Sequence, residues 1–248
     1  VTATDKKRGR GKKITFSPIK NFATKNNIPV HQPKNLKSEE FINLMKKIKP
    51  DLFVVVAFRM LPEIIINIPQ YGSINLHASL LPNYRGAAPI NWVIINGERE
   101  TGVTIFFINK KIDEGDIISK KEIKINKDET AGSLHDKLMK EGAKLLRDSI
   151  KNIFIKNIKR EIQKISLKDI KAPKIQKKDC FINLDLGYKN IIQPIKGLSP
   201  YPGARIIHNN KVFKIIDAKN INNYVAEIGL NQIEDKIILN NNNKESIQ

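Results

Sequence analysis

Residues 73–118 read SINLHASLLPNYRGAAPINWVIINGERETGVTIFFINKKIDEGDII. The first five of them, 73–77, indicate a short strand. Asn75 and His77 lie two positions apart on this strand, so its period-two geometry points both side chains to the same face. Because ligands bind at the strand ends of open α/β sheets, we expect this pair to face a site.

Two loops of the same segment add further polar groups. Ser79 begins a rigid apolar loop, and Arg85 follows it. An acidic loop, from Asp113 to Asp116, comes after the next expected strand, 102–108. A histidine, an amide and a carboxylate can together polarise a carbonyl, stabilise an oxyanion and move a proton.

Taken singly, these residues have simpler explanations. An Asn-x-His pair at a strand end is more often incidental than catalytic. Asp113 and Asp116 beside a glycine are typical turn formers. Arg85 alone could be a surface cation. Only their combination and order favour a catalytic site.

The flanking residues alternate between expected helices and strands. The Val-rich run 52–57 is typical of a strand buried on both faces of a parallel sheet. We expect helices to begin at Pro18 and at Ser38 and a third helix to span 89–96. A further strand is expected over 117–125. Thr130 opens a long helix, and its buried side is expected to be formed by Leu134, Leu138, Leu145, Leu146 and Ile150. This alternation predicts an open α/β sheet.

Composition narrows the class of protein. The chain has 248 residues, is 40% hydrophobic and contains one cysteine, which excludes an intramolecular disulfide or a cysteine metal cluster. Its apolar runs are shorter than the roughly 18 residues of a membrane span. We therefore expect a cytoplasmic protein with no membrane association. The net charge of +19 has two open explanations: contact with a phosphate polymer, or biased use of Lys, Asn and Ile.

The ordered pattern resembles the 10-formyltetrahydrofolate-dependent formyltransferase family. It runs Asn-x-His-x-Ser-Leu-Leu-Pro-x-x-Arg-Gly-x-x-Pro, then Thr-Gly-Val-Thr, then Asp-x-Gly-Asp, between Asn75 and Asp116. Over most of the chain, from Asp5 to about Phe213, the resemblance is to members that act on methionyl-tRNA. The basic segment 9–13, the form of the Arg-Gly motif at 85–90 and the segment 197–202 carry this narrower resemblance.

The resemblance implies a fold and a division into domains. The fold would be a Rossmann-like, open, mainly parallel sheet followed by a small β-rich, OB-like domain. Residues 1–155 would form the formyltransferase domain, 156–179 a basic linker, and 180–248 the tRNA-binding domain. The family begins with a strand and a helix that precede the segment opening this chain, so we expect both to be missing and the last domain to be shortened.

The resemblance also implies a reaction. A formyl group would pass from 10-formyltetrahydrofolate, the co-substrate, to the amino group of methionine esterified to initiator tRNA. Asn75 and protonated His77 would donate hydrogen bonds to the formyl oxygen, and Asp113 would favour the charged form of His77 and accept the amine proton through water. No metal would be required.

Binding residues are implied in the same way. The folate would contact Phe58, Leu61, Ser79, Leu80, Leu81, Pro82 and Asp116. The tRNA would contact Arg10, Lys12, Lys13 and Arg85, and the protein would be a monomer. His31, His135 and His208 lie outside the pattern and are interpreted as structural or surface residues. Two alternatives stay open: a related formyltransferase acting on an amino sugar or glycinamide ribonucleotide, and an inactive tRNA-binding fragment.

Overall fold

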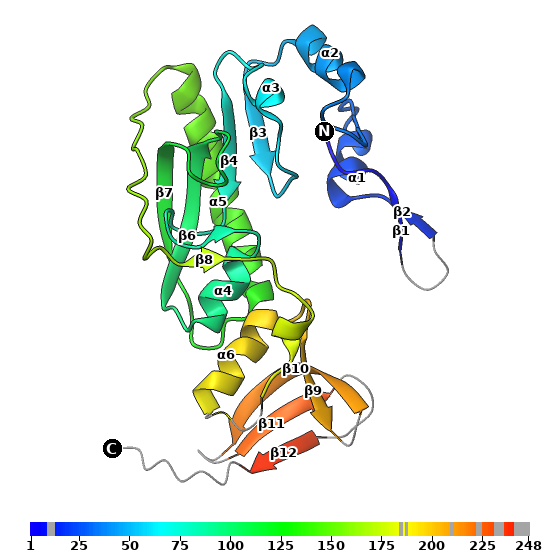
Figure 1. Cartoon of the computed structure of the whole chain (residues 1–248), viewed down its shortest axis with the longest axis vertical. Coiled ribbons are helices and arrows are strands. Elements are labelled where there is room, and N and C mark those ends of the chain that lie inside the picture. The colour runs from blue at the N-terminus through cyan, green and yellow to red at the C-terminus, as the bar shows by residue number, and fades with distance from the viewer. Residues whose placement is uncertain are drawn as a thin grey trace.

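A computed structural model describes residues 1–8, 13–183, 186, 188–208, 211–221, 225–230 and 236–240. Figure 1 shows three parts in succession: an N-terminal unit, a central sheet with its helices, and a C-terminal sheet. In the described part of the chain, no helix is both long enough and apolar enough to span a bilayer.

The N-terminal unit holds a short hairpin and two helices. Strands β1 (Lys6–Arg8) and β2 (Lys13–Thr15) pair antiparallel. Helix α1 (Pro18–Lys25) begins after Ser17, whose hydroxyl accepts the N–H of Lys20. Helix α2 (Glu39–Ile48) begins after Ser38 in the same way, with Phe41 N–H as donor. Such caps satisfy N–H groups that the first turn leaves free, so the helix starts expected from sequence are confirmed.

The central sheet has the order β3-β4-β6-β7, formed by β3 (Phe53–Val56), β4 (Ser73–His77), β6 (Glu100–Phe107) and β7 (Ile117–Lys124). The open α/β sheet is confirmed. The expectation that it is mainly parallel is corrected, because of its three strand pairs only β3–β4 is parallel, while β4–β6 and β6–β7 are antiparallel. Helix α4 (Pro89–Ile95) lies in the connection between β4 and β6.

Strand β3 lies at one edge of this sheet, beside β4. Val54 and Val56 are 41% and 51% exposed, whereas burial on both faces was expected. That prediction was wrong because an unbroken apolar run does not reveal how many neighbours a strand has. Phe53, at the start of β3, packs with α2 and α3 (Glu63–Ile66) around a cluster that includes Phe41, Met45 and Ile65.

Helix α5 (Ala131–Phe154) lies along the sheet, as Figure 1 shows. Its cap is Thr130, whose hydroxyl accepts the N–H of Ser133, while the Ser133 hydroxyl accepts the N–H of Thr130. Leu134 and Leu138 are buried in one cluster with Val93 and Val103. The helix therefore fixes α4 and β6 in one core.

The predicted linker, 156–179, contains the short β8 (Lys171–Ala172), which pairs parallel with β5 (Arg85–Gly86), and it leads into the 3-10 helix η1 (Lys178–Cys180). Beyond it, α6 (Tyr188–Leu198) precedes β9 (Ala204–His208), β10 (Lys211–Ile221), β11 (Val225–Leu230) and β12 (Lys236–Asn240). These four strands form one antiparallel sheet, so the small β-rich domain is confirmed. Helix α6 was not predicted.

Candidate active site

Two site residues come from β4. Asn75 pairs with Val55 on β3 and Phe106 on β6, and His77 pairs with Thr104 on β6, so neighbouring strands hold the backbone of each residue in place. His77 is 6% exposed. Its Nε2 lies 2.8 Å from the carbonyl oxygen of Tyr84, which can only accept. Nε2 therefore carries a proton, and Nδ1 is the ring nitrogen left for chemistry.

Asp113 faces that second nitrogen. Its Oδ2 lies 3.8 Å from His77 Nδ1, an ion-pair separation slightly longer than a hydrogen bond. The same oxygen accepts the backbone N–H of Gly86 at 3.0 Å. Asp113 has a φ of 54°, in the left-handed region, so its loop is turned sharply to bring the carboxylate inward. The structure thus brings Asn75, His77 and Asp113 together.

Gly86 fixes the loop that donates to Asp113 against β8. Its φ is +126°, and a Cβ there would lie 2.5 Å from the carbonyl oxygen of Ala172. Only glycine allows this close approach. Tyr84, the acceptor for His77, is buried too. Its hydroxyl donates to Glu98 at 2.5 Å, and burial, with that carboxylate, raises the pKa of the Tyr84 phenol well above its usual range.

A cavity of about 840 Å³ opens beside the trio. Asn75, His77 and Asp113 line it together with Phe58 and Leu61. This volume is within the range of small-molecule and cofactor sites. Two of the residues expected to contact folate, Phe58 and Leu61, therefore face the same space as the trio.

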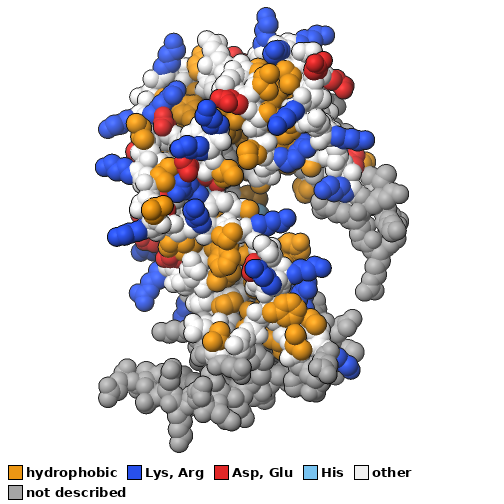
Figure 2. Space-filling view, viewed as in Figure 1, with side chains coloured by type: hydrophobic (Ala, Val, Ile, Leu, Met, Phe, Trp, Pro, Cys, Tyr) orange, Lys and Arg blue, Asp and Glu red, His pale blue; other side chains and the backbone are white. Residues whose placement is uncertain are grey.

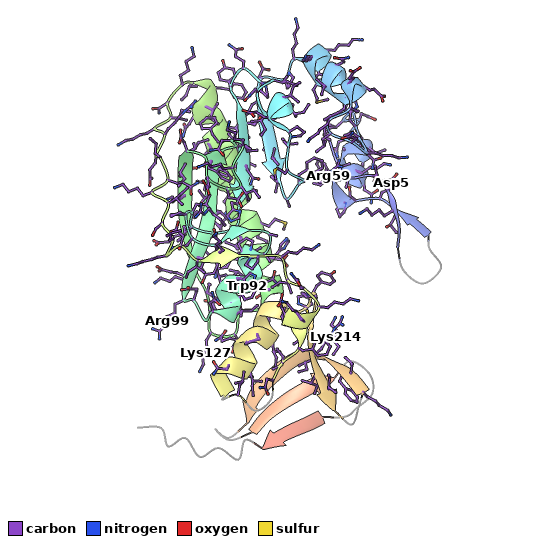
Figure 3. All side chains as sticks on the ribbon, in the orientation of Figure 1. Asp5, Arg59, Trp92, Arg99, Lys127 and Lys214 are labelled. Carbon is purple, nitrogen blue, oxygen red and sulfur yellow. The ribbon has the colours of Figure 1, made fainter. Side chains whose placement is uncertain are left out.

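Several cavity residues had no signal in the sequence. His135 and Met139 lie on α5 and line the cavity, although His135 was interpreted as structural or surface. Arg59 also lines it, and its guanidinium donates to the carbonyls of Pro33 and Lys34 at 2.8 and 2.9 Å. Figure 3 shows Arg59 between the end of β3 and the N-terminal unit. It ties the two parts together at the cavity.

The loop that follows His77 is built into the core. Ser79 is fully buried, and its hydroxyl donates to the carbonyl of Asn83 at 2.7 Å. The hydroxyl of Thr104 donates to the Ser79 carbonyl at 2.7 Å and accepts from Leu81 N–H. The described residues that line the cavity do not include Ser79, Leu80, Leu81, Pro82 or Asp116. The loop therefore packs in the core against Thr104 and does not line the cavity.

Arg85 lies in a buried ion-pair network. Its side chain is 8% exposed, and its two terminal nitrogens lie 2.8 Å from Glu114 and 3.1 Å from Asp169. Its Nε donates to the carbonyl of Pro82 at 3.2 Å. With all three nitrogens engaged, the guanidinium joins the two loops of the site. It does not project from the surface.

The structure describes only some of the basic residues that are expected to contact tRNA. Arg10 and Lys12 lie outside the described residues. Lys13 begins β2 in the N-terminal hairpin. Figure 2 shows Lys and Arg side chains spread over the visible face of the molecule, so the positive charge is not gathered into one patch there.

Sequence comparison extends beyond the trio. Residues 1–150 match the family model described as "Formyl transferase", and residues 174–245 match "Formyl transferase, C-terminal domain". A methionyl-tRNA formyltransferase from Flavobacterium johnsoniae is 48% identical over 224 residues, which is 88% of this chain and 71% of that protein. Its counterpart from Clostridium acetobutylicum is 49% identical with the same coverage. In other curated relatives, such as that from Bacteroides fragilis, the chain spans 64% of the length.

Structure comparison gives the same fold at lower identity. A 4-N formyltransferase from Francisella tularensis superposes with a TM-score of 0.68 at 23% identity, over 82% of this chain and 83% of that chain. The sugar 3N-formyl transferase WlaRD, solved in the presence of dTDP and 5-N-formyl-THF, gives 0.62 at 24% identity, over 91% and 82%. The family model covers more than half of the chain, and relatives that are 48–49% identical align over 88% of the chain. This chain therefore belongs to the formyl transferase family.

Proposed function

We propose that this chain transfers a formyl group from 10-formyltetrahydrofolate to the amino group of methionine esterified to initiator tRNA. The single observation that carries the proposal is the grouping of Asn75, His77 and Asp113 in the lining of a cavity of about 840 Å³. The names of the relatives, methionyl-tRNA formyltransferases at 48–49% identity, favour this acceptor.

The geometry suggests how the residues share the work. The amine attacks the formyl carbon, and negative charge develops on the formyl oxygen. Asn75 donates a side-chain N–H to that oxygen. Because Nε2 of His77 is engaged with Tyr84, protonated Nδ1 is the second donor. Donors held ready for a developing oxyanion stabilise the transition state more than the ground state.

Asp113 has two parts in this scheme. Its carboxylate lies 3.8 Å from Nδ1 and places a negative charge beside the ring when His77 acts as a donor. It also offers a place, through water, for the proton that leaves the attacking amine. The remaining rate enhancement comes from holding folate and aminoacyl ester together in one site.

The co-substrate and partner follow from the same proposal. The folate occupies the cavity, with its ring system against the apolar side chains of Phe58 and Leu61. WlaRD was solved in the presence of a formyl-folate, which supports this choice of co-substrate. Initiator tRNA is held by Arg10, Lys12 and Lys13 and by the C-terminal domain. The protein acts as a monomer in the cytoplasm, and no metal takes part.

A formyl-transfer assay tests the proposal. The chain is incubated with 10-formyltetrahydrofolate and three acceptors in turn: methionyl initiator tRNA, an amino-sugar nucleotide and glycinamide ribonucleotide. We expect turnover with the tRNA alone and none with His77→Ala. Turnover with a small acceptor only would assign the chain to another branch of the family.

A binding measurement separates an enzyme from an inactive tRNA-binding fragment. A stable formyl-folate analogue should raise the melting temperature of the wild-type chain, since a ligand that binds only the folded state stabilises it by mass action. The absence of any shift at saturating analogue, together with retained tRNA binding, would identify the fragment.

A further inference from the structure

The predicted linker does more than connect two domains. After α5 the chain returns along β7, where Glu161 exchanges backbone hydrogen bonds with Ile117 at 2.8 and 2.9 Å. The guanidinium of Arg160 lies over the ring of Phe107, 4.1 Å from its centroid. We call residues 160–172 the strap. Its contacts reach both loops of the site.

One strap residue reaches the loop that carries Asp113. Gln163 is 7% exposed, and its Nε2 donates to the backbone carbonyls of Asp113 at 3.0 Å and Gly115 at 2.7 Å. Two carbonyl oxygens can only accept, so the amide nitrogen must be the end that faces them. The side-chain oxygen is buried without a hydrogen-bond partner among the described residues.

The same strap also anchors the opposite loop. Asp169 accepts from Arg85 at 3.1 Å, and the carbonyl of Ile170 accepts the N–H of Tyr84 at 2.5 Å. Tyr84 is the residue whose carbonyl orients His77. The strap therefore holds the orienting group of His77 on one side and the backbone of Asp113 on the other.

We propose that Gln163 is a positioning residue for the formyl transfer, holding Asp113 at its distance from His77. The inference rests on the proposed function. Asp113 has a left-handed φ of 54°, a conformation that non-glycine residues seldom adopt without support. The paired bonds to the carbonyls of Asp113 and Gly115 supply that support from a residue 50 positions away in sequence. Gln163 does not line the cavity, so its effect acts through Asp113.

The chemistry of Gln163 points to placement more than to stability. A residue needed only to fill space would not bring a buried oxygen that lacks a partner among the described residues. Such an oxygen is unfavourable, and methionine of similar length would remove it. The amide is useful here because its two N–H groups can serve two carbonyls that point the same way.

The test compares Gln163→Met with a control, Ile162→Ala, whose side chain is 77% exposed one position earlier in the strap. Formyl transfer to methionyl initiator tRNA is measured as kcat and KM. Hydrogen–deuterium exchange is followed in residues 109–116 and in β6. A displacement of about 1 Å at a reacting group can lower a rate by roughly 100-fold. We expect kcat of Gln163→Met to fall roughly 10- to 100-fold, with KM for tRNA within about twofold.

The exchange data separate positioning from general loosening. Residues 109–116 should exchange faster in Gln163→Met while β6 keeps wild-type protection, and Ile162→Ala should match wild type in both measurements. Wild-type kcat in Gln163→Met, or faster exchange in β6 as well, would overturn the inference. If the wild-type chain itself transfers no formyl group, the proposed function fails, and unchanged exchange in 109–116 still overturns the placement of Asp113 by Gln163.

Discussion

The carbonyl of Tyr84 orients the ring of His77. The oxygen accepts the Nε2 proton at 2.8 Å, which leaves Nδ1 directed at Asp113, 3.8 Å away. The ring cannot turn over without losing a buried hydrogen bond, because each of its two nitrogens has its own neighbour. A histidine held in this way presents one defined nitrogen to a bound substrate.

Replacement of Asn75 tests the other donor of the proposed oxyanion site. Asn75→Asp keeps the size of the side chain but removes the N–H donors and adds a negative charge beside the developing oxyanion. We expect kcat to fall by at least about 10²–10³, the usual effect of losing one such donor. Asn75→Ala should fall by the same order. Single-turnover rates measure the loss, and folate binding, measured separately by fluorescence, should remain. A rate close to that of wild type would remove Asn75 from the mechanism.

Asp113→Asn isolates the charge of the carboxylate. The amide oxygen can still accept the N–H of Gly86, so the loop should keep its conformation. What disappears is the negative charge 3.8 Å from Nδ1, together with the proposed acceptor of the amine proton. We expect kcat to fall roughly 100- to 10,000-fold, the range typical of proton-transfer groups, with an unchanged melting temperature. If activity were retained at all pH values, Asp113 would serve the fold alone.

Substitution of Arg85 tests whether its side chain holds the two loops together or contacts tRNA. In Arg85→Met, Glu114 and Asp169 lose their buried partner, and breaking a buried ion pair from one side typically destabilises by about 3–5 kcal/mol. Because Glu114 is a quarter exposed, we expect the lower end, about 3 kcal/mol, measured by urea unfolding. Arg85→Lys, which keeps the charge without the fork, should lie between wild type and Arg85→Met.

The kinetic readout completes the Arg85 experiment. At a temperature where Arg85→Lys is fully folded, KM for tRNA should stay close to that of wild type, and its salt dependence should not change. A rise in KM with normal stability and a shallower salt dependence would instead place Arg85 on the tRNA.

Glu141 gives a pH-dependent contribution to stability. Hydrogen bonds from Lys121 and Lys144 lower the pKa of this carboxyl from 4.5 to about 2. A group with a depressed folded-state pKa stabilises the fold above its unfolded pKa, and this stabilisation is lost as the pH falls through the folded value. The melting temperatures of wild type and Glu141→Gln should therefore differ above about pH 5 and converge between pH 4.5 and about 2.

Two conditions check the origin of the Glu141 effect. Because the pairs that Glu141 makes lie on the surface, about 0.5 M salt should shrink the difference, since the Debye length becomes short. Glu122→Gln, an exposed neighbour on β7, is the matched control. An equal effect of both substitutions would mean that overall charge, not the pairing with Lys121 and Lys144, sets the pH dependence.

Local signals in the sequence placed most elements correctly. The strand expected over 73–77 is β4, and Ser38 and Thr130 cap the helices that they were expected to open. Caps and short-range periodicity depend on residues close in sequence, so a single chain reveals them. Helix α6 was missed because Pro194 and Gly197 are usually helix breakers.

Only part of the site could be predicted from the sequence, because several of its residues are placed by partners far away in the chain. Asn75 and His77 share a face because a strand alternates, and their motif supplied Asp113. The loop 79–82 could not be placed, because its burial depends on Thr104 on the neighbouring strand. Arg85 resembled a free cation because its partners lie 29 and 84 residues distant. Gln163 gave no signal at all, since an isolated glutamine in a Lys-rich segment looks like a solvated side chain.

Gly197 lets α6 seat directly on α4. A Cβ there would lie 2.5 Å from Ile95, and the Gly197 carbonyl accepts from the side chain of Asn91 at 2.7 Å. Helix α4 begins three residues after Gly86, the donor to Asp113. A larger residue at 197 would meet the backbone of α4 as well, so α6 could not lie as close to α4. Gly197 therefore sets how closely the C-terminal domain approaches the helix that follows the Gly86 loop.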